Sequence, residues 1–270
     1  MIPATRERRT RAVLPRVEDG RVREPVYRPV ITTAFSVFRA LDLTITVHGD
    51  EHLPREGGAV LATSHWGYLD FGLAGAATWL YGRRYVRFLA KQEVWSHPVA
   101  GPLMRGMRHI PVDRSAGDGA YQHAVKALRA GELVGLHPEG TVSRSFTIEP
   151  LRTGAVRMAS EAEVPLVPMA IWGSQRVLTK GRKRDLRAAR HVPIDIWVGP
   201  ALHPRPTDDP RAATADLRAA LARLAEQAAV AYGDRPGAGE RVWWMPAHLG
   251  GSAPTPEEAE AMKERHRPPR

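Results

Sequence analysis

The sequence of 270 residues contains no cysteine. This absence excludes disulfide bridges, metal sites held by thiolates and covalent catalysis by a cysteine, and it is compatible with a reducing compartment. A long apolar run is missing as well, because the stretch 30–47 is interrupted by Arg39 and Asp42 and falls short of the ~20 apolar residues of a spanning helix. This stretch is predicted to pack on the core or to lie at a membrane interface. The start of the chain lacks the apolar segment of a signal peptide, so we expect a protein that is not secreted.

Several motifs that would identify an enzyme class directly are absent too. The sequence has no G-x-S-x-G, no G-x-x-x-x-G-K-[ST], no G-x-G-x-x-G and no H-E-x-x-H. The usual support for a serine hydrolase, a P-loop protein, a dinucleotide-binding protein or a zinc protease is therefore missing. No RNA-binding signature and no Cys/His finger occurs, so no nucleic-acid partner is expected.

The composition is that of a globular protein with an excess of positive charge. Hydrophobic residues make up 43% and charged residues 25%, which allows a real core, and the net charge is +10. Nearly all of this excess lies in two segments, with +6 in 175–190 and +3 in 1–24. Each is interpreted either as a solvated basic face or as a segment that docks to an anionic membrane surface.

Short apolar strands alternate with helices along the chain. Strands are predicted at 44–48, 59–63, 85–90, 107–112, 132–136, 164–172 and 194–198, and helices at 29–41, 68–81, 95–105, 118–129, 153–162 and 210–232. This order indicates an α/β fold with a mostly parallel sheet flanked by helices. We expect a basic N-terminal arm at 1–24, a folded domain at 25–235 and a flexible C-terminal tail at 236–270, whose WWM cluster lies at a membrane interface or packs back on the domain.

A histidine and an aspartate follow the second predicted strand, in the segment SHWGYLD. His65 and Asp70 form an H-x-x-x-x-D pair, a spacing that recurs at His203 and Asp208 in a Pro-rich loop. Position separates the two pairs, because the loops that follow strands of open α/β sheets are where function gathers. If a turn at Gly67 brings the first pair together, Asp70 fixes the tautomer of His65 and leaves its other nitrogen free as a general base. The alternative is a histidine held in a purely structural hydrogen bond.

Three further elements follow in the chain. The strand at 107–112 is followed directly by Asp-Arg, and Arg114 can bind phosphate through two hydrogen bonds. Another strand is followed by HPEGT, in which Glu139 can accept from a hydroxyl and Gly140 lets the backbone approach a ligand. The last element is the Val-Pro-rich strand at 164–172, whose prolines shape a wall.

These four elements, in this order, resemble the glycerolipid acyltransferase family, which includes the 1-acylglycerol-3-phosphate acyltransferases. The family's pattern is N-H-x-S-x-x-D, then G-x-x-F/I-V-x-R, then F-P-E-G-T-R-S, then a Val-Pro-rich strand, and the resemblance spans about 48–200. It implies a catalytic pair and a set of substrate-binding residues. The pair is His65 and Asp70, the phosphate is bound by Arg114 and Lys91, and the acceptor is positioned by Glu139, Gly140 and Thr141.

The chain departs from this pattern at four positions. Ser64 stands for Asn, Gly67 for Ser, His137 for Phe and Val142 for Arg. Because no serine nucleophile stands at position 67, direct attack of the acceptor is expected. Arg144 follows Val142 in the same loop and is a further candidate for the phosphate.

The resemblance implies an O-acyltransferase. The expected reaction moves a fatty acyl group from acyl-CoA or acyl carrier protein to a lysophospholipid, first of all 1-acylglycerol-3-phosphate, to give phosphatidate. No metal and no cofactor beyond the donor is expected, and an apolar groove for the acyl chain is predicted near 95–104. The enzyme is expected to lie peripherally on the cytoplasmic face of the cell membrane. The alternatives are another lipid or glycolipid acceptor, and a non-catalytic protein that binds anionic lipid or nucleic acid.

Overall fold

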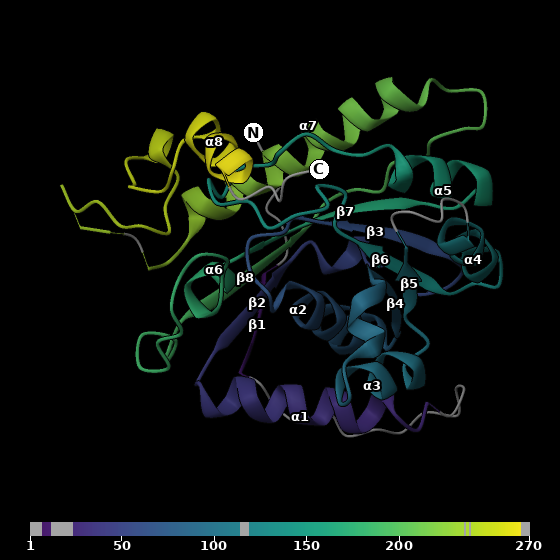
Figure 1. Cartoon of the computed structure of the whole chain (residues 1–270), viewed down its shortest axis with the longest axis horizontal. Helices are drawn as coiled ribbons and strands as arrows, with labels where there is room; N and C mark the ends of the chain where they lie inside the picture. The colour runs from purple at the N-terminus through teal and green to yellow at the C-terminus, as the bar shows by residue number, and fades with distance from the viewer. Residues whose placement is uncertain (1–6, 12–23, 114–118, 235, 238, 266–270) are drawn as a thin grey trace.

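The computed structural model describes residues 7–11, 24–113, 119–234, 236–237 and 239–265. Within these residues, eight strands form one sheet in the order β1-β2-β8-β7-β3-β6-β4-β5 (Figure 1). Their bounds are Glu7–Arg11 (β1), Thr44–His48 (β2), Ala59–Thr63 (β3), Val86–Lys91 (β4), Ile110–Val112 (β5), Leu133–Leu136 (β6), Leu166–Trp172 (β7) and Pro193–Val198 (β8). Neighbouring strands run parallel except β1 with β2 and β7 with β8. The mostly parallel sheet predicted from the sequence is confirmed.

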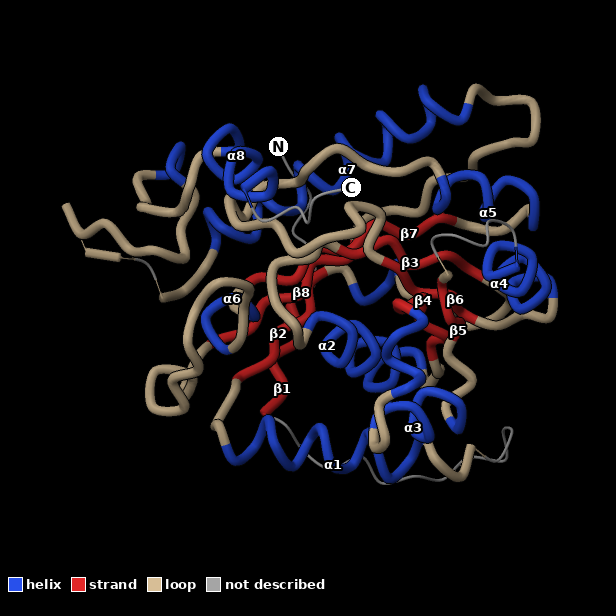
Figure 2. The backbone as a smooth tube through the Cα atoms, viewed as in Figure 1, coloured by secondary structure: helices blue, strands red, loops and turns tan. Residues whose placement is uncertain are grey.

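Helices flank this sheet on both faces (Figure 2). One side carries α1 (Tyr27–Ala40), α2 (Asp70–Ala77) and α3 (Ala100–Gly106), and the other carries α4 (Gly119–Arg129), α5 (Gly154–Ala162) and α7 (Pro210–Ala231). The short α6 (Ser174–Val177) follows β7, and α8 (Pro256–Arg265) lies near the C-terminus. Single turns of other helix types are found at Asp50–His52, Thr78–Gly82, Gln92–Ser96 and Ala247–Leu249.

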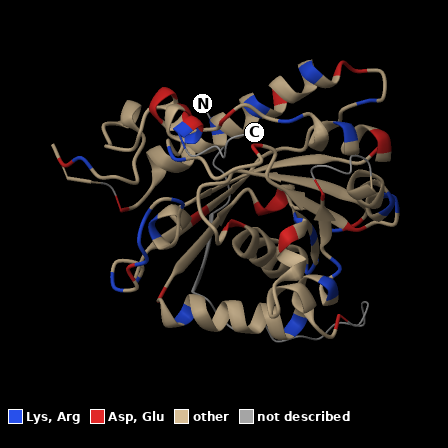
Figure 3. Cartoon of the chain, viewed as in Figure 1, with Lys and Arg blue, Asp and Glu red and all other residues tan. Residues whose placement is uncertain are grey.

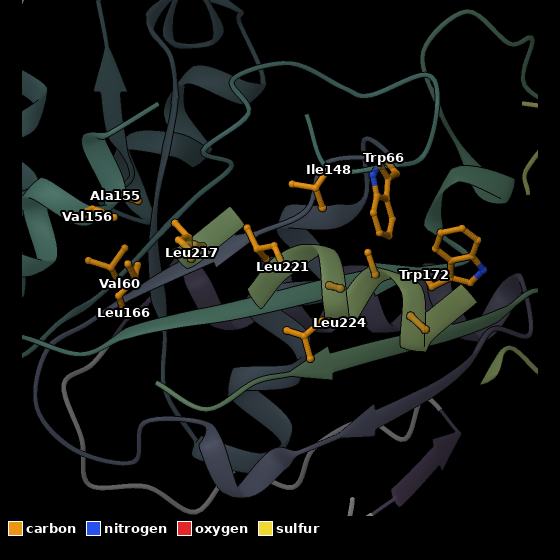
Figure 4. Close-up of a cluster of buried hydrophobic side chains, with 14 of the residues drawn as sticks. Val60, Trp66, Ile148, Ala155, Val156, Leu166, Trp172, Leu217, Leu221 and Leu224 are labelled. Carbon is orange, nitrogen blue, oxygen red and sulfur yellow. The ribbon is translucent and has the colours of Figure 1, made fainter. Parts of the chain in front are cut away.

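The core is divided by the sheet into two apolar clusters. All five residues of β3 are buried, as expected of a central parallel strand whose two faces are both covered. Val60 packs in the cluster that also contains Leu217 and Leu221 of α7 (Figure 4), whereas Leu61 packs in the cluster that contains Leu73 of α2. Successive side chains of a strand point to opposite faces, so β3 joins both halves of the core.

The stretch 30–47 packs on the core, which is the first of the two interpretations drawn from the sequence. Phe35 and Phe38 of α1 are buried in the second cluster, whereas Val37 is 47% exposed. The two aromatic rings set the buried face of α1, and Val37 lies outside it because neighbours along a helix point about 100° apart.

Local structure differs from the prediction at three places. The helix expected at 68–81 begins only at Asp70 and ends in a π-helical turn, and the helix expected at 95–105 is a 3₁₀ turn followed by α3. Pro98 separates these two pieces, since a proline cannot donate within a helix. The third difference is β1, which no apolar pattern predicted. This strand pairs with β2 at the edge of the sheet.

The C-terminal segment takes part in the core. Trp244, Met245 and Ala253 are buried in the first cluster, and the Tyr232 and Trp244 rings meet edge to face at 5.6 Å. Residues after 235, where the folded domain was expected to end, therefore pack on that domain. This is one of the two interpretations of the WWM cluster drawn from the sequence. Among the described residues, no helix has the length and apolarity needed to cross a membrane.

Candidate active site

The loops that carry the predicted site residues meet at one edge of the sheet. β3 lies between β6 and β7 and runs parallel to both, so the three strands end side by side. Their carboxyl ends lead into the loops that begin at Ser64, His137 and Gly173. This edge of an open α/β sheet is where ligands usually bind.

The structure brings His65 and Asp70 together across a tight turn. The His65 Nδ1 atom lies 3.1 Å from Oδ2 of Asp70, and the same oxygen accepts the backbone N–H groups of Trp66 and Gly67 at 2.8 and 2.9 Å. Asp70 is fully buried in the first turn of α2, where the helix dipole favours a carboxylate. The imidazole is partly exposed, and no described residue hydrogen-bonds to its Nε2. This nitrogen is available to a substrate.

Neighbouring loops hold this turn in place. A Cβ added to Gly67 would lie 2.9 Å from the backbone and Oγ of Ser174, so only glycine fits here. Thr179 donates its hydroxyl to the Trp66 carbonyl at 2.6 Å, and the Tyr68 N–H donates to the Leu178 carbonyl at 2.9 Å. The loop that follows α6 therefore packs directly behind the His65 turn.

Glu139 ties the loop after β6 to the histidine. Its Oε1 accepts the backbone N–H of His65 and its Oε2 accepts that of Glu149, both at 3.0 Å. Glu139 was expected to accept from a substrate hydroxyl, but backbone N–H groups donate to both of its oxygens. Burial raises the pKa of Glu139 to about 8, although the two N–H donors oppose this shift. Gly140 follows in the left-handed conformation that glycine favours, and the half-buried Thr141 comes next.

His137 is a neighbour of His65 that the sequence analysis did not assign to the site. The two imidazole rings stack with their centroids 3.8 Å apart and their planes at 2°. His137 Nδ1 lies 2.6 Å from the Thr63 hydroxyl, and the Phe71 ring packs 4.3 Å away. Burial, and then the proximity of His65, hold the pKa of His137 well below its usual range. A neutral ring thus supports His65 and adds no charge beside it. The only sequence signal was the exchange of Phe for His in HPEGT.

The three predicted phosphate ligands fall in different places. Lys91 ends β4 and is exposed, Arg144 lines a large cavity beside the turn, and Arg114 lies outside the described residues. Lys180 lines the same cavity, and its pKa is lowered by partial burial and by nearby cations, Arg144 foremost and Lys91 among them. Lys180 therefore lies within electrostatic range of two predicted ligands. It was overlooked because it belongs to the basic segment 175–190, whose charge was interpreted as surface charge.

Comparison with known proteins agrees with this geometry. The model of a family described as "Acyltransferase" matches residues 44–172. A 1-acyl-sn-glycerol-3-phosphate acyltransferase of Bacillus subtilis is 31% identical over 155 residues, which cover 56% of this chain and 75% of that protein. The chain belongs to the acyltransferase family. A protein of the same name from Limnanthes douglasii is 30% identical over 171 residues, 62% of this chain and 56% of that acyltransferase.

The solved structure of a relative supports the fold. The crystal structure of the 1-acyl-sn-glycerophosphate (LPA) acyltransferase PlsC from Thermotoga maritima matches with a TM-score of 0.62 and 19% identity, covering 78% of this acyltransferase and 80% of that chain. The predicted membership of an acyltransferase family and the predicted fold are thus confirmed.

Two departures of this acyltransferase from the family's motif have structural uses. Ser64 accepts the Ile171 N–H at 3.0 Å and is fully buried, so its hydroxyl joins β3 to β7. Gly67 leaves the space that Ser174 occupies. Among the described residues, no three His, Asp or Glu side chains are grouped so that they could hold a metal ion.

An apolar cavity of about 220 Å³ lies near the site of the acyltransferase, joined to it by Phe71. Phe71, whose ring lies 5.9 Å from that of His65, forms part of its wall. The rest comes from α1, α2, β4, the end of α3 and His109, which precedes β5. Met104 is the one lining residue from the stretch 95–104, where the groove was predicted. Small residues of α2, Gly72 and Gly75, leave this space open.

Proposed function

We propose that this acyltransferase moves an acyl group from a thioester to the free hydroxyl of 1-acylglycerol-3-phosphate and so forms phosphatidate. The observation that carries the proposal is the His65 imidazole, held through Nδ1 by a buried carboxylate while Nε2 faces a partly open site. The names of the relatives support the acceptor.

The reaction needs one proton to move twice. Nε2 of His65 takes the proton of the acceptor hydroxyl as the oxygen forms its bond to the thioester carbonyl carbon. Asp70 stabilises the imidazolium that results, as in other histidine–carboxylate pairs. When the tetrahedral intermediate collapses, the C–S bond breaks and the leaving sulfur takes the proton back from His65. Glu139 acts as a positioning residue, because it fixes the His65 backbone.

Cations at the sheet edge are proposed to hold the phosphate of the acceptor. Arg144 and Lys180 lie together beside the turn, and Lys91 is within electrostatic range of Lys180. Arginine can bind phosphate through two parallel hydrogen bonds. Arg114 stays a candidate ligand. No cofactor beyond the donor is needed for this chemistry.

The apolar cavity is proposed to receive the acyl chain. Its wall includes Phe71, whose ring packs near those of His65 and His137, and residues of α1 and of the end of α3. These two helices are neighbours in Figure 1. Val37 of α1, Leu103 of α3 and Val99, which precedes α3, are 47%, 38% and 66% accessible, and Arg39 and Arg105 lie close by in sequence. Apolar side chains flanked by arginines suit the surface of an anionic membrane. We propose that this face meets the lipid, with the enzyme peripheral on the cytoplasmic side.

An acceptor panel tests the proposal. Purified protein is given long-chain acyl-CoA or acyl carrier protein with lysophosphatidate, other lysophospholipids, a glycolipid or glycerol 3-phosphate. We expect lysophosphatidate to be acylated, and His65→Ala to lower kcat by about a thousandfold with the fold retained. His203→Ala is the matched control, because His203 is the exposed histidine of the second H-x-x-x-x-D pair. If only another acceptor is acylated, the proposal that lysophosphatidate is the acceptor is wrong. If no acylated product forms from any acceptor, the proposed acyltransferase activity is wrong.

A further inference from the structure

A second, larger cavity lies beside the His65 turn and is strongly basic. It measures about 960 Å³ and is formed by α6, the loop that follows it and the C-terminal segment. Figure 3 shows Lys and Arg gathered along this loop. Its lining includes one acidic residue, Asp185, and seven cations, one of which is Arg144 from the loop after β6. The other cations all come from the segment 175–190: Arg176, Lys180, Arg182, Lys183, Arg184 and Arg187.

Most of this charge is not neutralised within the described chain. Arg176 pairs with Asp234 at 2.6 Å. The Asp185 carboxylate accepts the N–H groups of Arg187 and Ala188, so it serves the turn of its own loop. Arg182, Lys183 and Arg184 make no ion pair with any described carboxylate. A concave site with this surplus of cations favours a ligand that carries several negative charges.

The cavity also has an aromatic wall. Trp243 lines it, with Phe146 packed at 6.1 Å, and the Arg182 guanidinium lies 4.1 Å from the centre of the indole ring. Planar bases stack well on an indole, and arginine binds phosphate beside such a stack. The combination therefore fits a nucleotide with phosphates better than it fits a lone phosphate group.

The cavity adjoins the catalytic turn. Leu178 and Thr179 line it and also hold the His65 turn, through the hydrogen bonds to Tyr68 and Trp66. A ligand in the cavity thus lies next to the loop that carries His65. A volume of this size is at the upper end of the roughly 300–1,000 Å³ of small-molecule sites.

We propose that this cavity binds the phosphorylated adenosine of a CoA thioester, with the adenine against Trp243 and the phosphates on Arg182, Lys183 and Arg184. The proposal rests on the proposed function and adds the identity of the donor, because an acyl carrier protein brings no such nucleotide. It also gives the basic segment 175–190 a role other than docking to a membrane, since a concave pocket receives a small molecule and a flat lipid surface does not enter it.

Direct binding tests the proposal without turnover. CoA and adenosine 3′,5′-bisphosphate are titrated calorimetrically into the full chain and into two double variants. Arg182→Ala with Lys183→Ala is expected to raise the Kd of both ligands by about tenfold or more, the loss of one or two charge-assisted hydrogen bonds. The matched control, Arg190→Ala with Arg223→Ala, removes the same charge from exposed residues that do not line the cavity and is expected to change the Kd less than twofold.

Kinetics supply a second readout. The cavity variant is expected to raise KM for acyl-CoA about tenfold and to leave KM for the acceptor within twofold. Acyl-pantetheine lacks the nucleotide, so its KM should rise no more in the cavity variant than in the control variant. Circular dichroism of each variant verifies folding.

Three outcomes would overturn the donor site. These are no binding of CoA, equal losses in both double variants, and a loss of binding to vesicles of phosphatidylglycerol with unchanged CoA affinity, which would assign the segment to the membrane. Failure of the proposed function gives a different result, namely bound CoA without acylated product from any donor.

Discussion

One carboxylate oxygen of Asp70 accepts hydrogen bonds from three groups. Oδ2 meets Nδ1 of His65 and the N–H groups of Trp66 and Gly67, while Oδ1 is buried and has no partner among the described residues. The carboxylate thus has two roles at once. It shapes the turn through the backbone, and it supplies the negative charge that stabilises a protonated His65.

Asp70→Asn separates these two roles. An asparagine can keep its oxygen at the Oδ2 position and so preserve the turn, but it carries no charge. We expect kcat to fall by about 10³–10⁴-fold, with KM for both substrates changed less than threefold, as for histidine–carboxylate pairs in other enzymes. Steady-state kinetics measures this, and thermal unfolding verifies the fold. Asp208→Asn, in the second H-x-x-x-x-D pair, is the control. Retention of more than a tenth of kcat in Asp70→Asn would refute the electrostatic role.

At this scale the sequence was informative where the contact is local. The meeting of His65 and Asp70 followed from a strand end, a glycine and a short spacing. The stack of His137 on His65 could not be predicted in this way, because it depends on β3 and β6 being neighbours in the sheet. The same holds for Lys180, which reaches the site through the loop after β7.

At the scale of the element, α2 combines two tasks. Its first turn holds Asp70, and its glycines, Gly72 in the same turn and Gly75 in the next, line the apolar cavity. A Cβ added to Gly75 would lie 3.7 Å from Phe88, an ordinary contact, so the helix accepts a side chain there. The added side chain takes up part of the cavity, so α2 is the element that limits the length of the bound acyl chain.

Gly75→Val is therefore expected to shift the preference of the enzyme toward shorter acyl chains. Each methylene kept out of the cavity loses about 0.8 kcal/mol, so exclusion of two lowers kcat/KM for long donors by roughly tenfold. For donors that are two methylenes shorter, kcat/KM should fall by less than threefold. A series of acyl-CoA lengths measures this. Gly154→Val in α5, where an added Cβ meets nothing within 4 Å, is the control. An identical length profile in both variants would place the acyl chain elsewhere.

Elements, and the mostly parallel sheet, were predictable because their patterns are local, whereas the antiparallel direction of β8 was not. The strands at 44–48 and 59–63 occur where the apolar pattern indicated. The antiparallel direction of β8 is set by the long loop after α6, and an all-buried strand such as β7 carries the same pattern in either direction. The π-helical turn at Thr78–Gly82 likewise arises from packing that no periodicity records.

Across the whole molecule, charge is distributed very unevenly. The basic segment 175–190 lines one cavity, whereas Arg87 of β4 is buried and is paired with Glu24 and Glu132. Composition alone revealed the size of the surplus but not this arrangement. Arg87 has a further consequence, because it lies near the buried His109.

His109 makes the stability of the whole chain depend on acid. It is 9% exposed, and its Nδ1 accepts the Phe88 N–H at 3.1 Å. Burial first, and then the charge of Arg87, lower its pKa from 6.5 to about 4, although Glu24 opposes the shift. Below pH 6.5 His109 is protonated in the unfolded chain but stays neutral in the folded chain until the pH approaches 4. The contribution of neutral His109 is therefore complete above pH 6.5 and is lost as the pH falls toward 4.

His109→Asn should remove this dependence, because an asparagine oxygen can replace Nδ1 as the acceptor and does not titrate. The free energy of unfolding of the wild type relative to the variant is expected to drop by about 2–3 kcal/mol between pH 7 and pH 4.5. Urea denaturation at both pH values measures it, and taking the difference cancels groups common to both proteins, including Glu139, whose raised pKa acts in the opposite direction. His203→Asn, at an exposed position, is the control. A difference that stays constant with pH would show that His109 is protonated as readily in the folded chain as in the unfolded one.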